Sequence, residues 1–460
     1  MNDSSVERIR VRPANPILTG PIFPTLLRLT LPNLAAMLAA TLVAIAETIY
    51  VGLLGTVQLA AIALVFPLTM LMQMLSAGAM GGGVSSSISR ALGANDEQRA
   101  ESLAIHALVI GLTVGLAFSF LFFAGAGPVL WLLGGRGAVL EQALLYAGIA
   151  LTGAVFTWAL NTLASILRGT GNMRVPAVTL LVASALQIVL GGVMGLGFGP
   201  VPRLGLPGVA WGLVISQALG ALLLLWFLGA GRARVGLSPR QTTLRRGMFS
   251  DILKVGAVSA LQPLQTVLTV LIVTSLVARF GTDALAGFGI GARLEFLLVP
   301  IVFALGVASV PMVGMAIGAG DSRRARKVAW TSAAIAMTVL GAIGLVVTMV
   351  PDVWSGLFTT DPAVRDSANL YLRLAGPGFA FFGLGLSLYF ASQGSGRVLF
   401  AVLASMVRLA LVAICGPLLI WLEAPAWTLF ALVGASLLAY GLSIALAVYR
   451  TPWGEGSVAR

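Results

Sequence analysis

The sequence predicts an all-α integral membrane protein with twelve transmembrane helices. Of its 460 residues, 58% are hydrophobic and only 10% are charged, whereas a soluble domain is about 45–50% apolar and roughly 25% charged. The hydrophobic residues form long unbroken runs without the strict alternation of barrel strands, and such runs favour helices. A helix needs roughly 20 apolar residues to cross a hydrocarbon core of about 30 Å, and we find twelve such segments.

The twelve segments divide into two groups of six. The longest polar connector runs from Gly231 to Gly247 and separates the sixth segment from the seventh. We therefore expect an N-terminal lobe over residues 1–230, a basic linker over 231–249 and a C-terminal lobe over 250–460. The spans are expected near residues 24–54, 58–89, 101–124, 140–166, 173–197, 207–229, 250–279, 284–317, 328–350, 366–391, 398–420 and 426–449.

The positions of Lys and Arg predict the orientation in the membrane. With the N-terminus inside, 21 of the 28 cationic residues fall in inner segments, 5 fall in outer segments and 2 lie within spans. Because cationic residues mark the cytoplasmic side, we expect both termini to be cytoplasmic. The net charge of +12 lies in short loops beside apolar runs, so it indicates a lipid bilayer and not a nucleic acid. Nothing in the pattern implies an obligate protein partner.

The chain has one Cys and one His, which limits its metal chemistry. Cys415 lies in an apolar run, so we expect no intramolecular disulfide, no zinc site and no bound cofactor. His106 starts the third span and is expected to be packed or hydrogen-bonded rather than a proton relay. No Lys-Ser/Thr pair follows Gly81, Gly82 and Gly83, so these glycines favour close helix packing and not a phosphate loop. An ATP-driven pump is thereby excluded.

The two halves of the chain resemble each other. Three pairs of segments are alike at offsets of 225, 225 and 226 residues: 91–100 with 316–325, 169–171 with 394–396, and 51–60 with 277–286. Because each half has six spans, both halves enter the membrane from the same side, and the repeat is parallel about an axis along the membrane normal. Repeated lobes with a site between them are typical of secondary transporters.

Short pieces of the loops and of the first span resemble one family. They are residues 30–33 (TLPN), 47–55 (ETIYVGLLG), 167–176 (LRGTGNMRVP) and the Gly-Ala-Gly-Asp turn that ends at Asp321. Together they resemble the multidrug and toxic compound extrusion (MATE) family over essentially the whole chain. The resemblance implies a multi-pass transporter of the cell (inner) membrane that exports cationic or amphipathic drugs. Export would be coupled to entry of protons or sodium ions.

Glu47, Glu295, Arg293 and Arg408 are the clear charged residues deep in the predicted spans. A charge at the bilayer centre costs at least about 2.5–3.5 kcal/mol, so it usually faces a cavity and has a function. Glu47 lies roughly 12 Å inside the outer end of the first span, at 1.5 Å per residue. Removal from water favours the neutral form of a carboxyl group, as proton coupling requires.

The resemblance also implies a role for Glu47. Family members hold an acid, more often Asp, about fifteen residues after a helix-bending proline, and Pro32 stands at that spacing here. We therefore predict Glu47 as the coupling-ion site and Pro32 as a helix bend. The alternative is a structural carboxyl group that pairs with a neighbouring helix.

The fifth span departs from the family pattern. Many relatives carry Asn and, four residues later, Asp, but the matching positions here are Gln187 and Gly191. Sodium prefers several oxygen ligands, which Glu47 with Gln187, Asn161 and Thr157 would supply. A site with a single acid suits a proton better. We therefore expect H⁺ as the coupling ion, with Na⁺ at Glu47 as the alternative.

Several polar and adaptable side chains are candidates for a substrate cleft. Glu295 resembles an acid found in part of the family, and it either attracts cationic drugs or pairs with Arg408; the sequence leaves both open. Methionine offers an adaptable surface, although such a stripe more often packs or meets lipid. The cleft candidates are Glu295, Gln262, Gln265, Met70 and Phe66.

Two other classes of function compete with drug export. A flippase or exporter of a lipid-linked or metabolite precursor would need a strongly cationic central cavity, and only Arg293 and Arg408 are available. A membrane enzyme would need a cluster of His, Asp or Glu at one depth. One His and two deep acids make that class the least favoured.

Overall fold

The computed structural model describes residues 16–237 and 243–453, and all regular elements in these two ranges are helices. The termini and the centre of the predicted linker, residues 238–242, lie outside them. The first half contains α1 (Pro16–Thr19), α2 (Ile22–Leu54), α3 (Thr56–Gln73), η1 (Met74–Met80), α4 (Gly81–Gly93), α5 (Glu97–Leu132), α6 (Gly137–Ala150), α7 (Ala154–Gly169), α8 (Arg174–Leu196) and α9 (Leu206–Gly229). The second half contains α10 (Arg246–Ser259), α11 (Leu261–Val277), η3 (Ala278–Phe280), α12 (Thr282–Gly318), α13 (Ser322–Met349), α14 (Asp352–Ser355), α15 (Pro362–Ala375), α16 (Gly378–Ser395), α17 (Leu399–Trp421) and α18 (Ala426–Arg450).

The described helices supply twelve spans. Ten helical stretches are long and apolar enough to cross a membrane, and two bent pairs complete the set. The bends are 45° between α6 and α7 and 55° between α15 and α16. Pro377 follows α15 and has no backbone N–H for a continuous helix, which explains the second break. Each predicted span has its counterpart, so the predicted fold class is confirmed.

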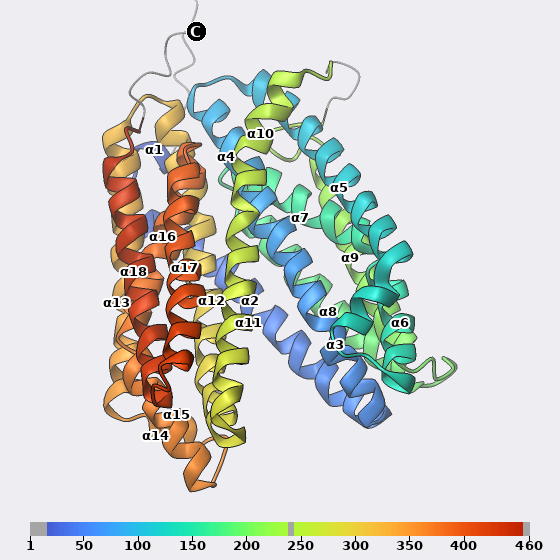
Figure 1. Cartoon of the computed structure of the whole chain (residues 1–460). Helices are drawn as coiled ribbons and strands as arrows, with labels where there is room; N and C mark the ends of the chain where they lie inside the picture. Colours follow the sequence, from blue (N-terminus) through green and yellow to red (C-terminus); the bar gives the residue numbers. More distant parts are fainter. Residues whose placement is uncertain (1–15, 238–242, 454–460) are drawn as a thin grey trace, which may run out of the picture.

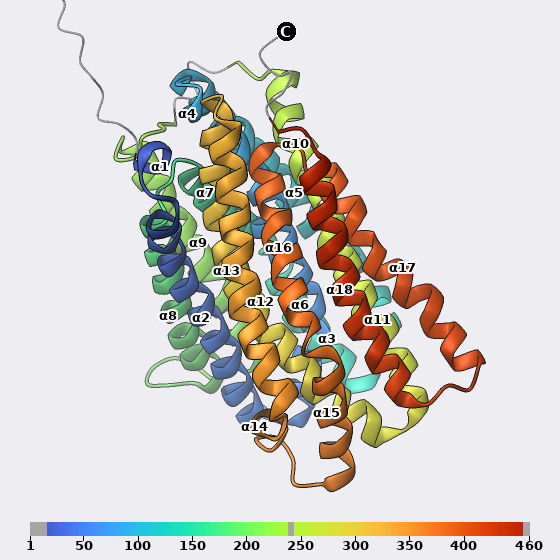
Figure 2. The ribbon, with the colours of Figure 1, turned by 90° about the vertical axis from the view of Figure 1, so that its left-hand side faces the viewer.

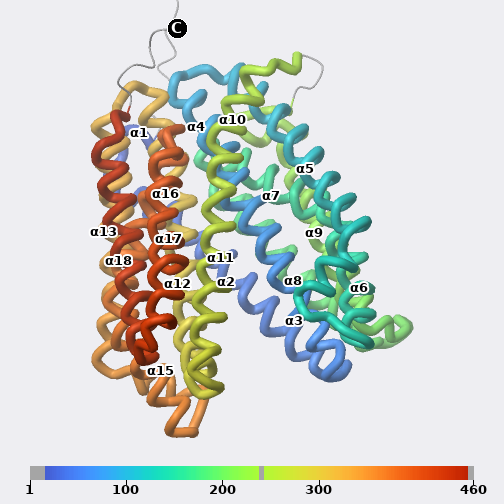
Figure 3. Tube along the Cα trace, in the orientation of Figure 1, coloured from blue at the N-terminus to red at the C-terminus, as the bar shows by residue number. Residues whose placement is uncertain are grey.

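The spans form two bundles (Figure 1). In the N-terminal lobe α8 packs against α2 and α9, and α5 packs against α7; in the C-terminal lobe α16 packs against α12, α13 and α18. The bundles lie close together at the end that carries α10 and diverge toward the opposite end, as the chain trace shows (Figure 3). α10 begins at Arg246, earlier than the expected start of the seventh span, and packs against α4 and α5 of the first lobe.

The internal repeat is visible in the backbone. Asp96 caps α5 by accepting a hydrogen bond from the Arg99 N–H (2.9 Å), and Asp321 caps α13 by accepting one from the Arg324 N–H (2.8 Å). Residues at matching places in the two halves share a positive φ: Asn95 and Gly320 (60° and 80°), Gly171 and Gly396 (85° and 77°), and Gly55 and Gly281 (139° and 102°). The two lobes therefore follow one backbone path in one direction.

The outer surface of the bundles is apolar. Along α2 the exposed residues recur every three or four positions, which places them on one helix face. In a soluble protein such a stripe would be covered, whereas in a membrane it meets hydrocarbon. Its members are Leu38, Leu42, Ile45, Ile49 and Leu53, each more than half exposed.

The repeated caps lead to the first prediction. Asp96→Ala and Asp321→Ala should each lower the stability of the purified protein by about 1 kcal/mol, because each removes the acceptor for an N-terminal backbone N–H of a helix. Asn retains that acceptor, so Asp96→Asn and Asp321→Asn should unfold close to the wild-type temperature. Thermal unfolding followed by tryptophan fluorescence measures both. Equal stability of the Ala and Asn variants would contradict the capping role.

Candidate coupling site and the contact between the lobes

Glu47 lies at the contact between α2 and α8. The side-chain amide of Gln187 on α8 donates a hydrogen bond from Nε2 to Glu47 Oε1, at 2.8 Å. Ile45 and Ile49 point to the exposed face of α2, so the carboxyl group points into the lobe. The structure thus brings together the two residues that the sequence analysis placed in one site; their part in ion coupling stays a prediction.

Two tyrosines that the sequence analysis did not single out lie beside Glu47. Tyr50 follows one helical turn later, and its buried hydroxyl has no hydrogen-bond partner among the described residues. A Cβ atom at Gly191 would lie 2.7 Å from that hydroxyl oxygen, so Tyr50 occupies the space beside the position where relatives carry a second acid. Tyr146 of α6 is buried and close enough to interact electrostatically with Glu47 and Tyr50. The i, i+3 spacing of Glu47 and Tyr50 was the available sequence signal.

Asn161 makes its contacts away from Glu47. Its Nδ2 donates to Gln73 Oε1 at 3.0 Å and to Ser76 Oγ at 2.9 Å. Asn161 and the buried Thr157 belong to α7, which packs against η1, α4 and α9, whereas Glu47 faces α8. The amide hydrogens of Asn161 are thus used at Gln73 and η1, and a ligand set shared by Asn161 and Glu47 stays a prediction.

Glu295 and Arg408 form a buried ion pair in the C-terminal lobe. Arg408 Nη2 lies 2.7 Å from Glu295 Oε1, and the two side chains are 4% (Arg408) and 14% (Glu295) exposed. The Tyr371 hydroxyl donates to the second carboxylate oxygen at 3.4 Å. Of the two roles that the sequence left open for Glu295, the structure shows the pairing. Arg408 compensates its charge, so this acid is not free to attract a cation.

The remaining cleft candidates are dispersed. Gln262 donates from Nε2 to the Tyr440 hydroxyl at 2.9 Å, and Gln265 donates to Gln262 Oε1 at 3.3 Å. Both glutamines are buried inside the C-terminal lobe, because α11 packs against α17 and α18. Phe66 is 55% exposed and Met70 is half-buried. The structure therefore does not gather Gln262, Gln265, Met70 and Phe66 into one lining.

One carboxylate joins the lobes at the end where they meet. Asp251 of α10 accepts from Arg90 Nη2 at 2.9 Å through Oδ1 and from Arg99 Nη2 at 2.8 Å through Oδ2. Both arginines belong to the N-terminal lobe. Asp251 is 161 residues from Arg90 and 152 residues from Arg99 along the chain, so no local sequence pattern connects them.

Glycines allow the backbones of the two lobes to approach closely at the same end. A Cβ atom at Gly83 would lie 2.7 Å from the carbonyl oxygen of Ile252, and one at Gly82 would overlap the amide of Gln393. Ser86 donates a hydrogen bond to the Gln393 carbonyl oxygen. Small residues let membrane helices pack this closely, and the glycine run has the packing role that the sequence indicated.

His106 ties the start of α10 to α5. Its Nε2 is 2.9 Å from the backbone N of Arg245, and its Nδ1 is 2.7 Å from the Ser102 carbonyl oxygen. An amide N–H only donates and a carbonyl only accepts, so Nε2 is the acceptor and Nδ1 carries the proton. The ring also packs edge-on against Phe249, at 4.7 Å between centroids. The expectation of a hydrogen-bonded, packed histidine agrees with this geometry.

Comparison with known proteins decides the family. The MatE family model matches two blocks of the chain, residues 32–193 and 259–418, one in each lobe. The chain belongs to the MatE family. It is therefore a multi-pass membrane transporter and not an enzyme, and the resemblance drawn from the loops is confirmed.

Known MatE relatives extend along most of the chain. The FAD transporter of Shewanella oneidensis is 26% identical over 395 residues, which cover 86% of this chain and 87% of the relative. The multidrug export protein MepA of Staphylococcus aureus is 25% identical over 396 residues, which cover 84% and 86%. A solved MOP superfamily transporter from Pyrococcus furiosus covers 95% of this chain and 97% of its own, with 23% identity and a TM-score of 0.86. This last likeness shows the shared fold.

The buried ion pair leads to the second prediction. Arg408→Met should lower stability by roughly 3–5 kcal/mol, because it leaves the Glu295 carboxylate buried without its cation. The double variant Glu295→Leu/Arg408→Met should recover most of the loss. Arg293→Met is the matched control, since Arg293 is exposed two residues from Glu295. Thermal unfolding in detergent distinguishes them, and a double variant as unstable as Arg408→Met would contradict the pairing argument.

Proposed function

We propose that the protein is a secondary active antiporter of the inner membrane that exports small amphipathic or cationic organic compounds in exchange for protons. The family and the name of the multidrug export relative support export of small molecules. The proposal of ion coupling rests on one observation: Glu47 is an acid within a membrane span, and the Gln187 amide donates a hydrogen bond to it. Within the described ranges no cationic side chain pairs with it.

The surroundings of Glu47 favour a proton over sodium. Gln187 donates to the carboxylate, and the Tyr50 hydroxyl, one turn away, can donate to a carboxylate or accept from a carboxylic acid. A shift of the Tyr50 side chain toward Glu47 would let this hydroxyl serve either protonation state of the acid. Sodium prefers several oxygen ligands, whereas Gln187 presents its amide nitrogen, a hydrogen-bond donor, to Glu47. Sodium remains the alternative ion. Glu295 is a weaker candidate, because Arg408 Nη2 already occupies one of its carboxylate oxygens at 2.7 Å.

We propose alternating access between the lobes, with the α10 end facing the cytoplasm and both termini inside. The support is the concentration of Arg90, Arg99, Arg245 and Arg324 at this end, where the positive-inside rule places cations. The lobes are joined here and diverge at the opposite end (Figure 1). Transport would require these contacts to separate while others form on the outer side. The driving force is the ion gradient, with no bound cofactor.

Export of a metabolite is a second candidate. One relative is named as a transporter of FAD, a metabolite. In addition, the charge of Glu295 is balanced by Arg408, so the C-terminal lobe has no unpaired deep acid among its described residues to select cations. Counterflow into proteoliposomes with ethidium and with FAD as alternative substrates separates the two. Exchange of FAD without exchange of ethidium would replace the drug proposal.

Glu47 gives the third prediction. Glu47→Gln mimics the neutral acid permanently, so it should insert normally but lose almost all gradient-driven efflux of ethidium from cells that lack their own pumps. Glu47→Asp should retain partial activity, because it keeps a carboxyl group in a slightly displaced position. Glu141→Gln is the control, since Glu141 is an exposed acid of the same lobe.

Efflux is measured with the proton and sodium gradients collapsed separately. If efflux stops only when the proton gradient is collapsed, proton coupling is supported. If it stops only when the sodium gradient is collapsed, sodium coupling is supported. Wild-type efflux by Glu47→Gln under a proton gradient would remove Glu47 from the mechanism.

Asp251 gives the fourth prediction. Asp251→Asn removes the charge that holds Arg90 and Arg99, so the inner contact should open more often. Val310, which lines a small cavity between the lobes, reports the opening as Val310→Cys in a Cys415→Ala background. We expect labelling by an impermeant thiol reagent in inverted vesicles to accelerate roughly tenfold, which corresponds to about 1.4 kcal/mol.

Asp321→Asn is the control for this experiment, because Asp321 lies at the same end and Asn also caps a helix. It should label at the wild-type rate. Unchanged labelling of the Asp251→Asn protein would show that the shared carboxylate does not hold the lobes together.

A further inference from the structure

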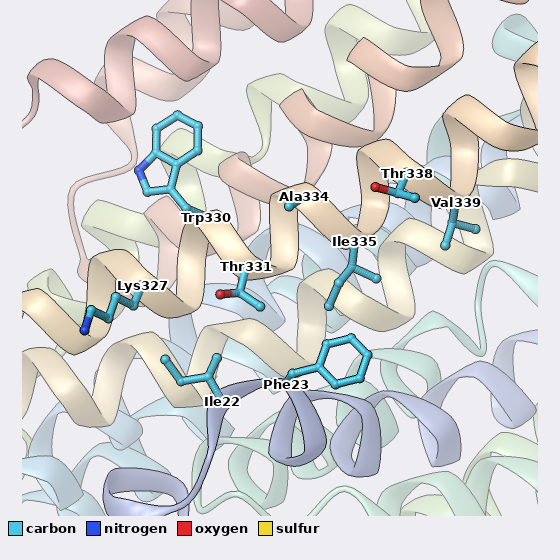
Figure 4. Close-up of a pocket in the computed structure, with 9 residues that line it drawn as sticks. All are labelled: Ile22, Phe23, Lys327, Trp330, Thr331, Ala334, Ile335, Thr338 and Val339. Atoms are coloured by element: carbon cyan, nitrogen blue, oxygen red, sulfur yellow. The ribbon is translucent and has the colours of Figure 1, made fainter.

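A groove runs along the bilayer-facing surface between α2 and α13. Its volume is about 830 Å³, and its walls are Ile22 and Phe23 of α2 and one face of α13 from Lys327 to Val339 (Figure 4). The two helices lie side by side on this face of the molecule (Figure 2). Since α2 belongs to the N-terminal lobe and α13 to the C-terminal lobe, the groove lies across the boundary between the lobes.

The length of the groove matches one leaflet of a bilayer. Lys327 and Val339 are separated by roughly 18 Å along α13, at 1.5 Å per residue, and half of a hydrocarbon core is about 15 Å. Between them Thr331, Ala334 and Thr338 recur on one face, and the small Ala334 leaves the middle of the groove open (Figure 4). Such a lining accommodates an extended hydrocarbon chain.

The end of the groove nearest α10 is cationic. Lys327 and, one turn earlier, Arg323 are exposed, and neither has an ion-pair partner among the described residues. Trp330 lies beside them and is partly exposed. Lys, Arg and Trp at this position are typical of the membrane–water interface, where cations attract anionic head groups.

We propose that this groove binds an anionic phospholipid of the adjacent leaflet. The phosphate lies against Lys327 and Arg323, and one acyl chain follows Ala334 between Phe23 and Ile335. A soluble anion would have no use for the apolar part, and an uncharged lipid would leave the two cations without a partner. Charge complementarity and the bilayer-facing position therefore favour one occupant that is both anionic and acylated.

Binding in this groove stabilises the arrangement of lobes described above. Arg324, next to Arg323, donates from Nη2 to the backbone carbonyl oxygens of Ile17 at 2.9 Å and Gly20 at 2.6 Å. These bonds hold the start of the N-terminal lobe against α13 beside the groove. A lipid that contacts both walls adds to this attachment, so the anionic lipid content of the membrane biases the closed inner contact. This inference is independent of the transported substrate and of the coupling ion.

The test is photocrosslinking in nanodiscs of phosphatidylcholine. Trace phosphatidylglycerol or phosphatidylcholine carrying a diazirine in its acyl chain is activated by light, and crosslinked peptides are located by mass spectrometry. Crosslinks to residues 328–339 should be more abundant with phosphatidylglycerol than with phosphatidylcholine. Each of the two cations, Lys327 and Arg323, is expected to raise this ratio by a factor of about five. Lys327→Gln/Arg323→Gln should reduce the yield with phosphatidylglycerol to that with phosphatidylcholine.

Two further variants fill the groove without altering charge. Ala334→Phe and Thr338→Phe should each reduce crosslinking of both lipids at 328–339, while Lys254→Gln, an exposed cation on α10, should leave it unchanged. Excess inorganic phosphate should not compete with the lipid. The proposal would be overturned if the wild-type protein gave equal crosslinking yields with the two lipids. It would also be overturned if both Phe variants gave the wild-type crosslinking yield. Competition by phosphate alone would show a simple anion site and would overturn it as well.

Discussion

Hydrocarbon supplies no hydrogen bonds, and the protein must satisfy its buried polar groups from within. The α2–α8 contact meets this requirement for Glu47 through Gln187, and the α12–α17 neighbourhood meets it for Glu295 through Arg408. Backbone groups are satisfied inside helices, which is why the described chain consists of helices and short turns. Where helices break, in the pairs α6–α7 and α15–α16, the breaks lie within the bundles' own packing. This constraint accounts for the positions of two deep acids, Glu47 and Glu295.

The two lobes share a backbone but not a charge pattern. At the repeat offset Glu47 corresponds to Val273, and Glu295 corresponds to Met70. Glu47 is bound by an uncharged amide, whereas Glu295 is bound by a cationic guanidinium group. The N-terminal lobe therefore holds a deep acid that has no cationic partner among the described residues, and the C-terminal lobe holds an internal ion pair. The two halves share a scaffold and differ in the chemistry of their deep acids.

The sequence predicted what depends on local pattern. Hydrophobic runs located the spans, the constant offset gave the parallel repeat, and the family spacing placed Glu47 with Gln187. It did not reveal that Asp251 bridges Arg90 and Arg99, because such contacts depend on how remote helices meet. It also did not reveal that Asn161 donates to Gln73 and Ser76, because the direction of this amide follows from the packing of α7 against η1, which periodicity does not encode. For Glu295 the sequence offered two roles, attraction of cationic drugs or pairing with Arg408, and the fold shows the pairing.

The contact that joins the lobes is built to separate. It is made of a shared carboxylate, serine-to-carbonyl hydrogen bonds and glycine approaches, all of which water can replace when the lobes part. At the same contact the buried polar atoms Ser85 Oγ, Arg168 Nε and Gln393 Oε1 have no protein partner within the described residues. Each buried polar group without a partner costs about 1–3 kcal/mol, and opening returns it to water. These costs oppose the ion pairs of Asp251, so the closed contact is held by a small difference between larger opposing free energies. Under the proposed coupling, a change of protonation at Glu47 would have only this small difference to reverse.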